Sequence, residues 1–397
     1  MPDVSEANVE QVPMRPMRVL YFVEGYTDIR FVVGLSEICD LKMVVPAKQY
    51  QSSGLKQRVA DAKLKFPVDE IPGGRLGFQA RSLRYLWNEA PNHDVILAQE
   101  VLRGAANANL VGVIRRVPVI TYMGIAPVEY FRCRRERRQI GLFKAWAGEA
   151  VIRLLMTFNG MLAKQCLAMG PYLRNIAAKY CANSDVGLYY GVDTRLFRPA
   201  DAAERVALRS KCNLPQGKFL IILSSRISHE KDPETVLRAT DMARQRGLDA
   251  VLINLGDGYQ DFLDLADRLQ LKSAKEWVLG LPAAHPMIGL ADYFRAADAM
   301  ALASLAEGAA YSTLESLACG TPLVATAVGG MAVQLKGYAR LTPRKDPSAM
   351  AEEFLWIAAN SGEAKAQALR GRDHVIEHWD RSLAFSKLKE SLESVNA

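Results

Sequence analysis

The chain has 397 residues, of which 50% are hydrophobic and 23% charged, so two folded domains are expected and a disordered protein is excluded. It contains no apolar stretch long enough to cross a membrane, and its six cysteines are scattered without metal-ligand spacing, which favours a reducing cytoplasm. The formal net charge of +7 favours anionic partners such as nucleotides, lipid headgroups or nucleic acid.

The N-terminal half alternates short apolar runs with segments of helical length. Residues 1–16 are polar, and we expect them to form a disordered tail. Strands that alternate with helices predict a parallel sheet with helices on both faces. Residues 17–190 are therefore predicted to form a Rossmann-like α/β domain. Its expected strands are residues 18–23, 41–45, 95–98 and 117–121.

The C-terminal half repeats this alternation, and residues 191–375 are predicted to form a second Rossmann-like domain. The boundary is expected within Gly191–Pro199. Apolar residues at helical spacing continue from residue 374 to residue 395. Residues 376–397 are expected to form a helix that packs back across both domains. The strands expected in the second domain are residues 219–224, 250–255, 277–279, 299–303 and 322–326.

Two glutamates separated by seven residues, Glu307 and Glu315, follow one of these strands. One interpretation is structural, because Ser312 and Glu315 have the spacing of a capping box and Glu307 is then an ordinary loop acid. The alternative is functional, because a helix that begins just after a strand of a parallel sheet offers N–H groups and a positive dipole end to a diphosphate. Glu315 would then reach ribose hydroxyls.

A second candidate lies after the strand at residues 219–224, where Arg226 and Lys231 occur. Ligands of α/β proteins bind outside the carboxyl ends of the strands, and two cations there would neutralise a diphosphate. The alternative is a solvated basic loop. Glycine turns at residues 256–258 and 328–330 would permit a close approach of the backbone, although each is a weak signal alone.

In their order along the chain, these segments resemble the retaining glycosyltransferases of family 4, which have the GT-B fold with two Rossmann-like domains facing a central cleft. Residues 191–199, Ala297-Asp298 and Ser304 also resemble family motifs. The resemblance implies that Arg226 and Lys231 bind the diphosphate of a nucleotide-sugar donor. It further implies that Glu307 faces the donor sugar, Glu315 the ribose and Leu281 the base. The remaining implied donor contacts are Gly308, Ala309, Ala310 and Ser312.

Two departures from the family pattern concern the site. Ala309 and Ala310 replace the second half of the usual E-G-F-G motif, although their backbone N–H groups remain. The histidine that often follows the strand at residues 117–121 is absent, and His93 precedes a strand, where we expect it at the opposite edge of the sheet. The contribution of the N-terminal domain to catalysis therefore stays open.

A basic run precedes an apolar-rich segment in the N-terminal half. One interpretation is a solvated helix face, and the other is a patch that meets an anionic membrane or the acceptor. Nucleic-acid binding is disfavoured, because no nucleic-acid module or stacking motif accompanies the charge. The residues of this run are Arg132, Arg134, Arg135, Arg137 and Arg138.

The sequence thus predicts a retaining glycosyltransferase with a carbohydrate or lipid-linked acceptor. No D-x-D motif occurs, and neither a metal nor another cofactor is expected, because Arg226, Lys231 and the helix start near Ser312 would stabilise the leaving diphosphate. The expected location is the cytoplasm or the inner face of a membrane. The alternatives are a nucleotide-sugar epimerase of the same fold, a non-catalytic nucleotide-sugar binder, and a basic membrane or nucleic-acid binding module.

Overall fold

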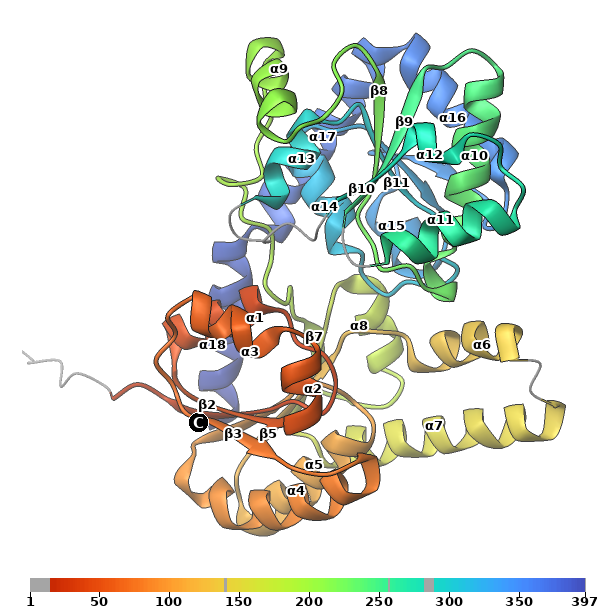
Figure 1. Cartoon of the computed structure of the whole chain (residues 1–397). Helices are drawn as coiled ribbons and strands as arrows, with labels where there is room; N and C mark the ends of the chain where they lie inside the picture. Colours follow the sequence, from red (N-terminus) through yellow and green to blue (C-terminus); the bar gives the residue numbers. More distant parts are fainter. Residues whose placement is uncertain (1–14, 139–140, 256–257, 282–288, 397) are drawn as a thin grey trace, which may run out of the picture.

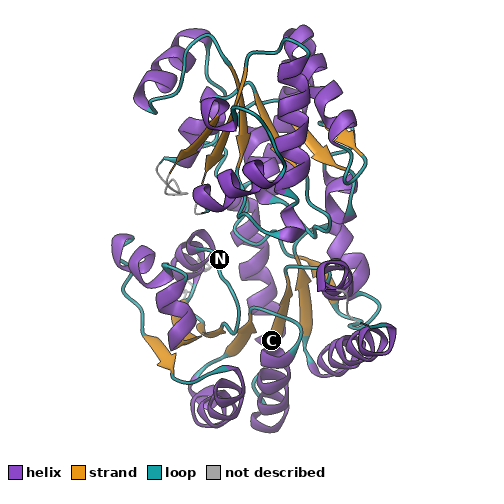
Figure 2. Ribbon diagram, turned by 45° about the vertical axis from the view of Figure 1, so that its right-hand side comes forward, coloured by secondary structure: helices purple, strands orange, loops and turns teal. Residues whose placement is uncertain are grey.

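The computed structural model describes residues 15–138, 141–255, 258–281 and 289–396. The predicted disordered tail lies almost wholly outside these residues, and so do residues 256 and 257 of the first predicted glycine turn. The described chain forms two α/β domains, one above the other in Figure 1, each with a sheet between helices in Figure 2. The predicted architecture of two Rossmann-like domains is confirmed.

The N-terminal sheet is entirely parallel and has the strand order β3-β2-β1-β4-β5-β6-β7. Both of its faces are covered, because Leu20 and Phe22 of β1 pack in one core cluster while Val19 and Tyr21 pack in another. Burial on both faces explains why this strand is apolar throughout. The strands are β1 (Arg18–Phe22), β2 (Asp40–Pro46), β3 (Val68–Ile71), β4 (Val95–Ala98), β5 (Val119–Met123), β6 (Gln165–Ala168) and β7 (Ser184–Val186).

The C-terminal sheet is also parallel, with the order β10-β9-β8-β11-β12-β13. Its first strand along the chain, β8, lies at the centre between β9 and β11, so the strand order reverses there. In open α/β sheets this reversal creates the crevice in which ligands bind. The strands are β8 (Phe219–Leu223), β9 (Ala250–Leu255), β10 (Val278–Leu281), β11 (Ala299–Leu302), β12 (Leu323–Thr326) and β13 (Arg340–Thr342).

Helices connect successive strands in both domains. Those of the N-terminal domain are α1 (Ile29–Ile38), α2 (Ala47–Ser52), α3 (Leu55–Asp61), α4 (Arg75–Glu89), α5 (Arg103–Arg115), α6 (Pro127–Arg138), α7 (Leu142–Leu162) and α8 (Pro171–Ala177), with the 3₁₀ turn η1 (Ala90–Asn92). Those of the C-terminal domain are α9 (Ala202–Lys211), α10 (Pro233–Gln245), α11 (Tyr259–Arg268), α12 (Ala274–Trp277), α13 (Leu290–Ala296), α14 (Tyr311–Ala318), α15 (Gly329–Gln334) and α16 (Pro347–Ala359), with the 3₁₀ turn η2 (His229–Lys231).

The chain crosses between the domains twice, and the two crossings lie side by side. Val192 and Asp380 form an isolated parallel bridge. The predicted single helix over residues 376–397 is wrong, because α17 (Ser361–Trp379) ends before Asp380 and α18 (Arg381–Asn396) begins after it. Asp380 has an extended backbone, and its carboxylate accepts from the N–H of Ser382, which starts the second helix. The break lets α18 pack on the N-terminal domain, where Phe385 lies against Gly34.

Candidate active site

Three loops meet at the carboxyl ends of β8, β11 and β12. Lys231, in the turn η2 after β8, donates to Glu307 Oε2 at 2.5 Å, and Ser304 Oγ donates to the same oxygen at 3.1 Å. The carbonyl of Glu307 accepts from the N–H of Gly330 at 2.9 Å. A Cβ at Gly330 would lie 1.8 Å from the carbonyl oxygen of Gly308, so glycine is required there. The structure thus joins Lys231 and Glu307, which the sequence places 76 residues apart.

Helix α14 begins directly after this loop, and Ala310 is its N-cap residue, without a side-chain hydrogen bond. The capping-box interpretation of Ser312 and Glu315 is therefore wrong. Ser312 already lies inside the helix, and Glu315 is directed elsewhere. The first N–H groups of α14 lack a side-chain cap, which leaves a partial positive charge beside Ala309 and Ala310.

The Glu315 carboxylate is buried, with 2% of the residue exposed, and it accepts a hydrogen bond from the Arg30 guanidinium of the N-terminal domain. Burial raises the pKa of Glu315 to about 7, while Arg30 acts in the opposite direction. Asp28, the N-cap residue of α1, holds Arg30 by two bonds of 2.9 Å. The Arg30 guanidinium also lies 4.0 Å from the centre of the Tyr190 ring. Glu315 therefore takes part in a buried ionic cluster between the domains, and its role toward a ribose stays a prediction.

The other predicted donor residues lie around the same crevice. Arg226 is exposed in the loop after β8. Burial raises the pKa of Tyr130 of the N-terminal domain, and the positive charge of Arg226 acts in the opposite direction. Leu281 is the last residue of β10, at the carboxyl end of that strand, and is half-buried. Gly308 packs against Leu173 of α8, because a Cβ there would lie 2.8 Å from that side chain. The predicted residues thus gather at the carboxyl edge of the second sheet, facing the first domain.

The basic run lies on α6, and its arginines contact different parts of the structure. Arg134 lies 4.0 Å from Glu230 of η2, and Tyr130 donates to the same carboxylate at 2.6 Å, so this face of α6 meets the C-terminal domain. Arg132 instead forms two bonds with Glu149 of α7. Arg135 is half-buried, and the side chains of Arg137 and Arg138 lie outside the described part of the chain. The run is not one continuous basic surface among the described side chains.

Two carboxyl groups lie at the carboxyl ends of β1 and β4, in the domain that lacks the expected histidine. Burial, together with the neighbouring Glu24, raises the pKa of Glu100 to about 8. Glu100 accepts from the N–H groups of Gly104 and Ala105 at the start of α5. Glu24 is bound by Arg103 at 2.9 Å. His93 ends the turn η1 just before β4, at the amino edge of the sheet, as predicted.

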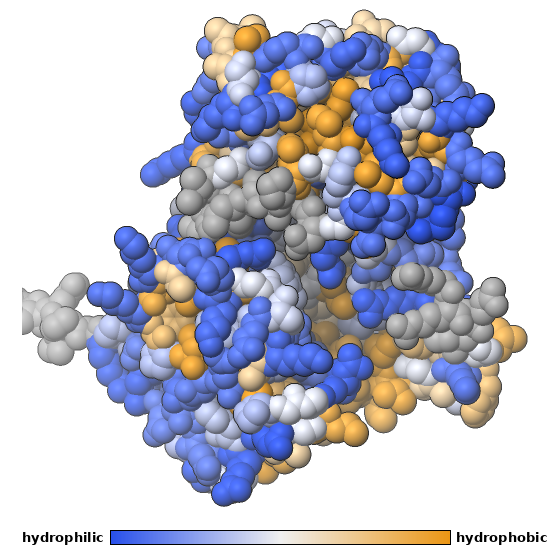
Figure 3. Space-filling model, in the orientation of Figure 1, coloured by the Kyte–Doolittle hydropathy of each residue, from blue (hydrophilic) through white to orange (hydrophobic). Residues whose placement is uncertain are grey.

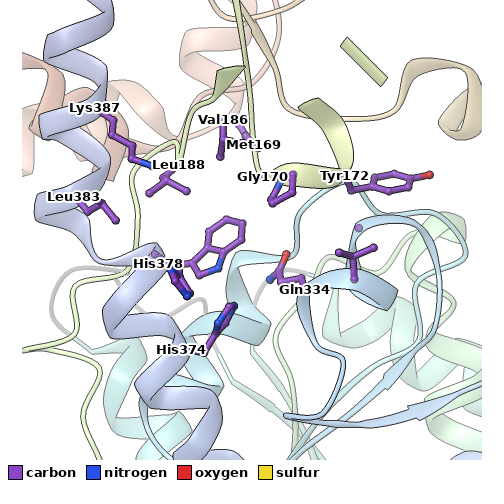
Figure 4. Close-up of a pocket in the computed structure, with 15 residues that line it drawn as sticks. Met169, Gly170, Tyr172, Val186, Leu188, Gln334, His374, His378, Leu383 and Lys387 are labelled. Atoms are coloured by element: carbon purple, nitrogen blue, oxygen red, sulfur yellow. The ribbon is translucent and has the colours of Figure 1, made fainter. Parts of the chain in front are cut away.

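A cavity of about 360 Å³ lies between the domains beside the donor loop. Figure 4 shows His374 and His378 of α17, Leu383 and Lys387 of α18, and Gln334 of α15 around it. Its wall is mainly apolar. The predicted donor contact Gly308 also lines it, so this cavity extends from the donor loop to the helices that cross between the domains.

Sequence reasoning missed three residues of the site: Arg30, Glu100 and Tyr130. Glu100 lies just after the end of β4, and Arg30 lies in the first turn of α1, the helix that follows β1, so the rule that sites lie at the carboxyl ends of strands indicates them. Tyr130 lies within a helix and carries no such signal. Among the described residues, the structure contains no group of three or more potential metal ligands and no helix long and apolar enough to span a bilayer.

Residues 204–374 match the family model described as glycosyl transferases group 1. The D-inositol 3-phosphate glycosyltransferase of Mycobacterium tuberculosis (strain F11) is 37% identical over 151 residues, which are 37% of this chain and 30% of that protein. The same-named protein of Arthrobacter sp. (strain FB24) is 33% identical over 148 residues, 36% of this chain and 33% of that protein. The matched stretch therefore spans about a third of the length of these curated relatives.

Solved structures resemble the chain over nearly its whole length. HepE of Anabaena in complex with UDP superposes with a TM-score of 0.74 at 18% identity, over 95% of this chain and all of that one. Sucrose-phosphate synthase from Thermosynechococcus elongatus superposes with a TM-score of 0.72 at 16% identity, over 96% and 98% of the two chains. At this identity the likeness establishes the fold, and the fold predicted from the sequence, GT-B, is confirmed.

Proposed function

We propose that this chain is a retaining glycosyltransferase that takes a sugar from a nucleotide-diphosphate donor, because residues 204–374 match the family model of glycosyl transferases group 1. The observation that carries the proposal is the pair of Lys231 and Glu307 at the start of the uncapped helix α14. Lys231 offers positive charge to a diphosphate, and the neighbouring Glu307 offers a carboxylate to a sugar.

The proposed chemistry is the loss of the diphosphate from the anomeric carbon. Negative charge develops on the leaving diphosphate, and Lys231, Arg226 and the N–H groups at the start of α14 would stabilise it. Positive charge develops on the sugar ring, beside the Glu307 carboxylate. The acceptor hydroxyl would attack from the face that the diphosphate leaves and give its proton to a phosphate oxygen, which retains the configuration.

The donor is proposed to be a UDP-sugar. HepE, whose fold this chain shares, has been solved with UDP and with UDP-glucose. The acceptor is proposed to be a carbohydrate or a lipid-linked sugar that binds on the N-terminal side of the cleft. Lys231, Arg226 and the helix start supply the positive charge that the donor requires, so we also propose that neither a metal nor another cofactor is needed.

We expect UDP to raise the melting temperature of the protein. A ligand present at about a hundred times its dissociation constant stabilises the folded state by about 2.7 kcal/mol, which corresponds to a shift of about 5–10 °C. The measurement is a thermal shift with UDP, GDP and ADP in parallel, and UDP is expected to give the largest shift. Arg226→Ala is the variant of choice, because Arg226 is exposed and its loss is expected to reduce the shift without lowering the melting temperature of the free protein.

Arg238 provides the matched control, because it is a partly exposed arginine on α10 whose charge is paired with Glu234. Arg238→Ala should keep the full UDP shift. Equal UDP-induced shifts in melting temperature for Arg226→Ala and the wild type would contradict a role of Arg226 in binding the diphosphate. Equal shifts with all three nucleotides would contradict the proposed base preference.

Donor turnover is expected to survive an excess of EDTA. The assay is the release of UDP from UDP-glucose in the presence of a carbohydrate and lipid extract as the acceptor mixture, with and without the chelator. Complete loss of turnover that magnesium or manganese restores would contradict metal independence. Release of UDP together with labelled sugar in the extract would also distinguish a transferase from an epimerase or a non-catalytic binder.

A further inference from the structure

Helix α7 exposes large apolar side chains along its whole length. The exposed fractions are 84% for Leu142, 78% for Phe143, 69% for Trp146, 69% for Leu154 and 77% for Met161, and Val151 and Phe158 are exposed as well. Isolated apolar residues on a surface are common, but seven on one helix form a patch of the kind that marks an interaction site. Figure 3 shows apolar surface gathered at the lower right, where α7 lies.

The exposed residues form one stripe. At about 100° per residue, the six from Phe143 to Met161 fall within about 140° of the helix circumference, over a length of about 27 Å. Lys144 and Arg153 lie at the two edges of that arc. The only acid of the helix, Glu149, is paired with Arg132 of α6. The stripe is therefore apolar with cationic margins.

The neighbouring helix α5 also exposes apolar side chains. Its residues Leu110, Val113 and Ile114 are exposed by 41%, 54% and 54%, and α5 packs against α7. At its end, the Arg115 guanidinium lies 5.1 Å from the centre of the Trp87 ring of α4, which is itself 43% exposed. Exposed apolar side chains near an arginine thus occur on α5 and α4 too.

We propose that the α7 stripe lies in the surface of an anionic lipid bilayer. An amphipathic helix with apolar residues on one face and cations beside them binds in the plane of such a surface, with its apolar side chains among the acyl chains. Figure 1 shows α6 between α7 and the C-terminal domain, so docking through α7 leaves the cleft between the domains uncovered. The membrane contact is thereby assigned to α7 and not to the basic run of α6, part of which meets the C-terminal domain.

The cations beside the stripe favour an anionic lipid surface over a second copy of the chain as its binding partner. Lys144 and Arg153 of one copy would face the same cations of another across an apolar contact, which is unfavourable, whereas anionic headgroups neutralise them. The inference rests on the proposed function only for its purpose, which is access to a lipid-linked acceptor. Vesicle binding and nucleotide binding are therefore measured separately.

The experiment compares the wild type with the double variant Phe143→Ser/Leu154→Ser by co-sedimentation with vesicles. The wild type is expected to bind vesicles of equal parts phosphatidylglycerol and phosphatidylcholine, to bind phosphatidylcholine alone more weakly, and to stay partly bound in about 1 M salt, where charges are screened beyond about 3 Å. The double variant is expected to lose binding at least about tenfold, because two inserted side chains are removed.

Val206→Ser is the matched control, since Val206 is 57% exposed on α9 of the other domain, and its binding should equal that of the wild type. The double variant and the control should both keep the melting temperature of the wild type and its UDP-induced shift. Unchanged binding of the double variant, or no binding by the wild type, would overturn the proposal. A wild-type dimer that the double variant turns into a monomer would assign the stripe to contacts between copies. A failed UDP shift with intact vesicle binding would count against the proposed function alone.

Discussion

Glu307→Gln is expected to lower kcat about 100-fold, while the donor KM changes little. In the proposed reaction the sugar gains positive charge as the diphosphate leaves, so a carboxylate beside it stabilises the transition state more than the bound substrate. The loss of one preorganised electrostatic contact of this kind typically costs about 100-fold or more in kcat. Glutamine keeps the shape and the hydrogen bond from Ser304 Oγ but removes the charge.

The assay is the release of UDP from UDP-glucose with the acceptor extract, over a range of donor concentrations. Ser304→Ala is the matched control, because it removes only the 3.1 Å hydrogen bond to Glu307 and leaves the charge. We expect it to lower kcat much less. Full kcat in Glu307→Gln would assign the Lys231–Glu307 pair to the structure of the loop, and the main argument for transferase chemistry would fail.

Arg30→Met is expected to lower the stability of the protein by about 3–5 kcal/mol, because it removes the partner of a buried carboxylate. Glu315 is 2% exposed, and Arg30 is the cation that binds it. For domains of this size the loss corresponds to a decrease in melting temperature of about 10 °C. The double variant Arg30→Met/Glu315→Gln should regain the part of the loss that comes from Glu315, since glutamine carries no charge to leave unpaired. Asp28 lacks its cation in both variants.

The loss of stability in Arg30→Met should depend on pH. Burial already raises the pKa of Glu315 to about 7 against the effect of Arg30, and without Arg30 this pKa rises further. An unfolded glutamate has a pKa of about 4.3. Above that value the folded variant binds more protons than the unfolded chain, so its stability falls as the pH rises toward the pKa of the folded state. Melting temperatures measured at pH 6 and pH 8.5 should therefore differ more for Arg30→Met than for the double variant.

The single variant Glu315→Gln tests the ribose role of Glu315. Glu315→Gln is expected to raise the donor KM and to leave kcat nearly unchanged if the carboxylate binds the ribose. An unchanged KM together with a changed melting temperature would restrict Glu315 to the contact between the domains. Equal melting temperatures of Arg30→Met and the wild type at both pH values would contradict the buried ion pair itself.

Much of the fold follows from the sequence, because buried strands and amphipathic helices carry local patterns. The central strands β1, β4, β8, β9 and β11 consist mainly of buried apolar residues, and their positions agree with the prediction. The strands that sequence reasoning missed are short, and three of them, β3, β7 and β13, are edge strands with partly exposed residues. An edge strand is covered less, so its pattern is weaker.

The contacts of the site also include some that the sequence indicates and others that only the tertiary structure shows. The sequence by itself placed Lys231 and Glu307 after strands of the same predicted parallel sheet, whose carboxyl ends meet at one edge. The tertiary structure showed that the two side chains pair. Only the tertiary structure decided that Glu315 pairs with Arg30, 285 residues away in the chain, and that Arg134 faces the other domain. It also decided that the apolar residues of α7 stay exposed. Helical spacing shows which residues share a face, but only the packing of the domains determines whether that face is covered.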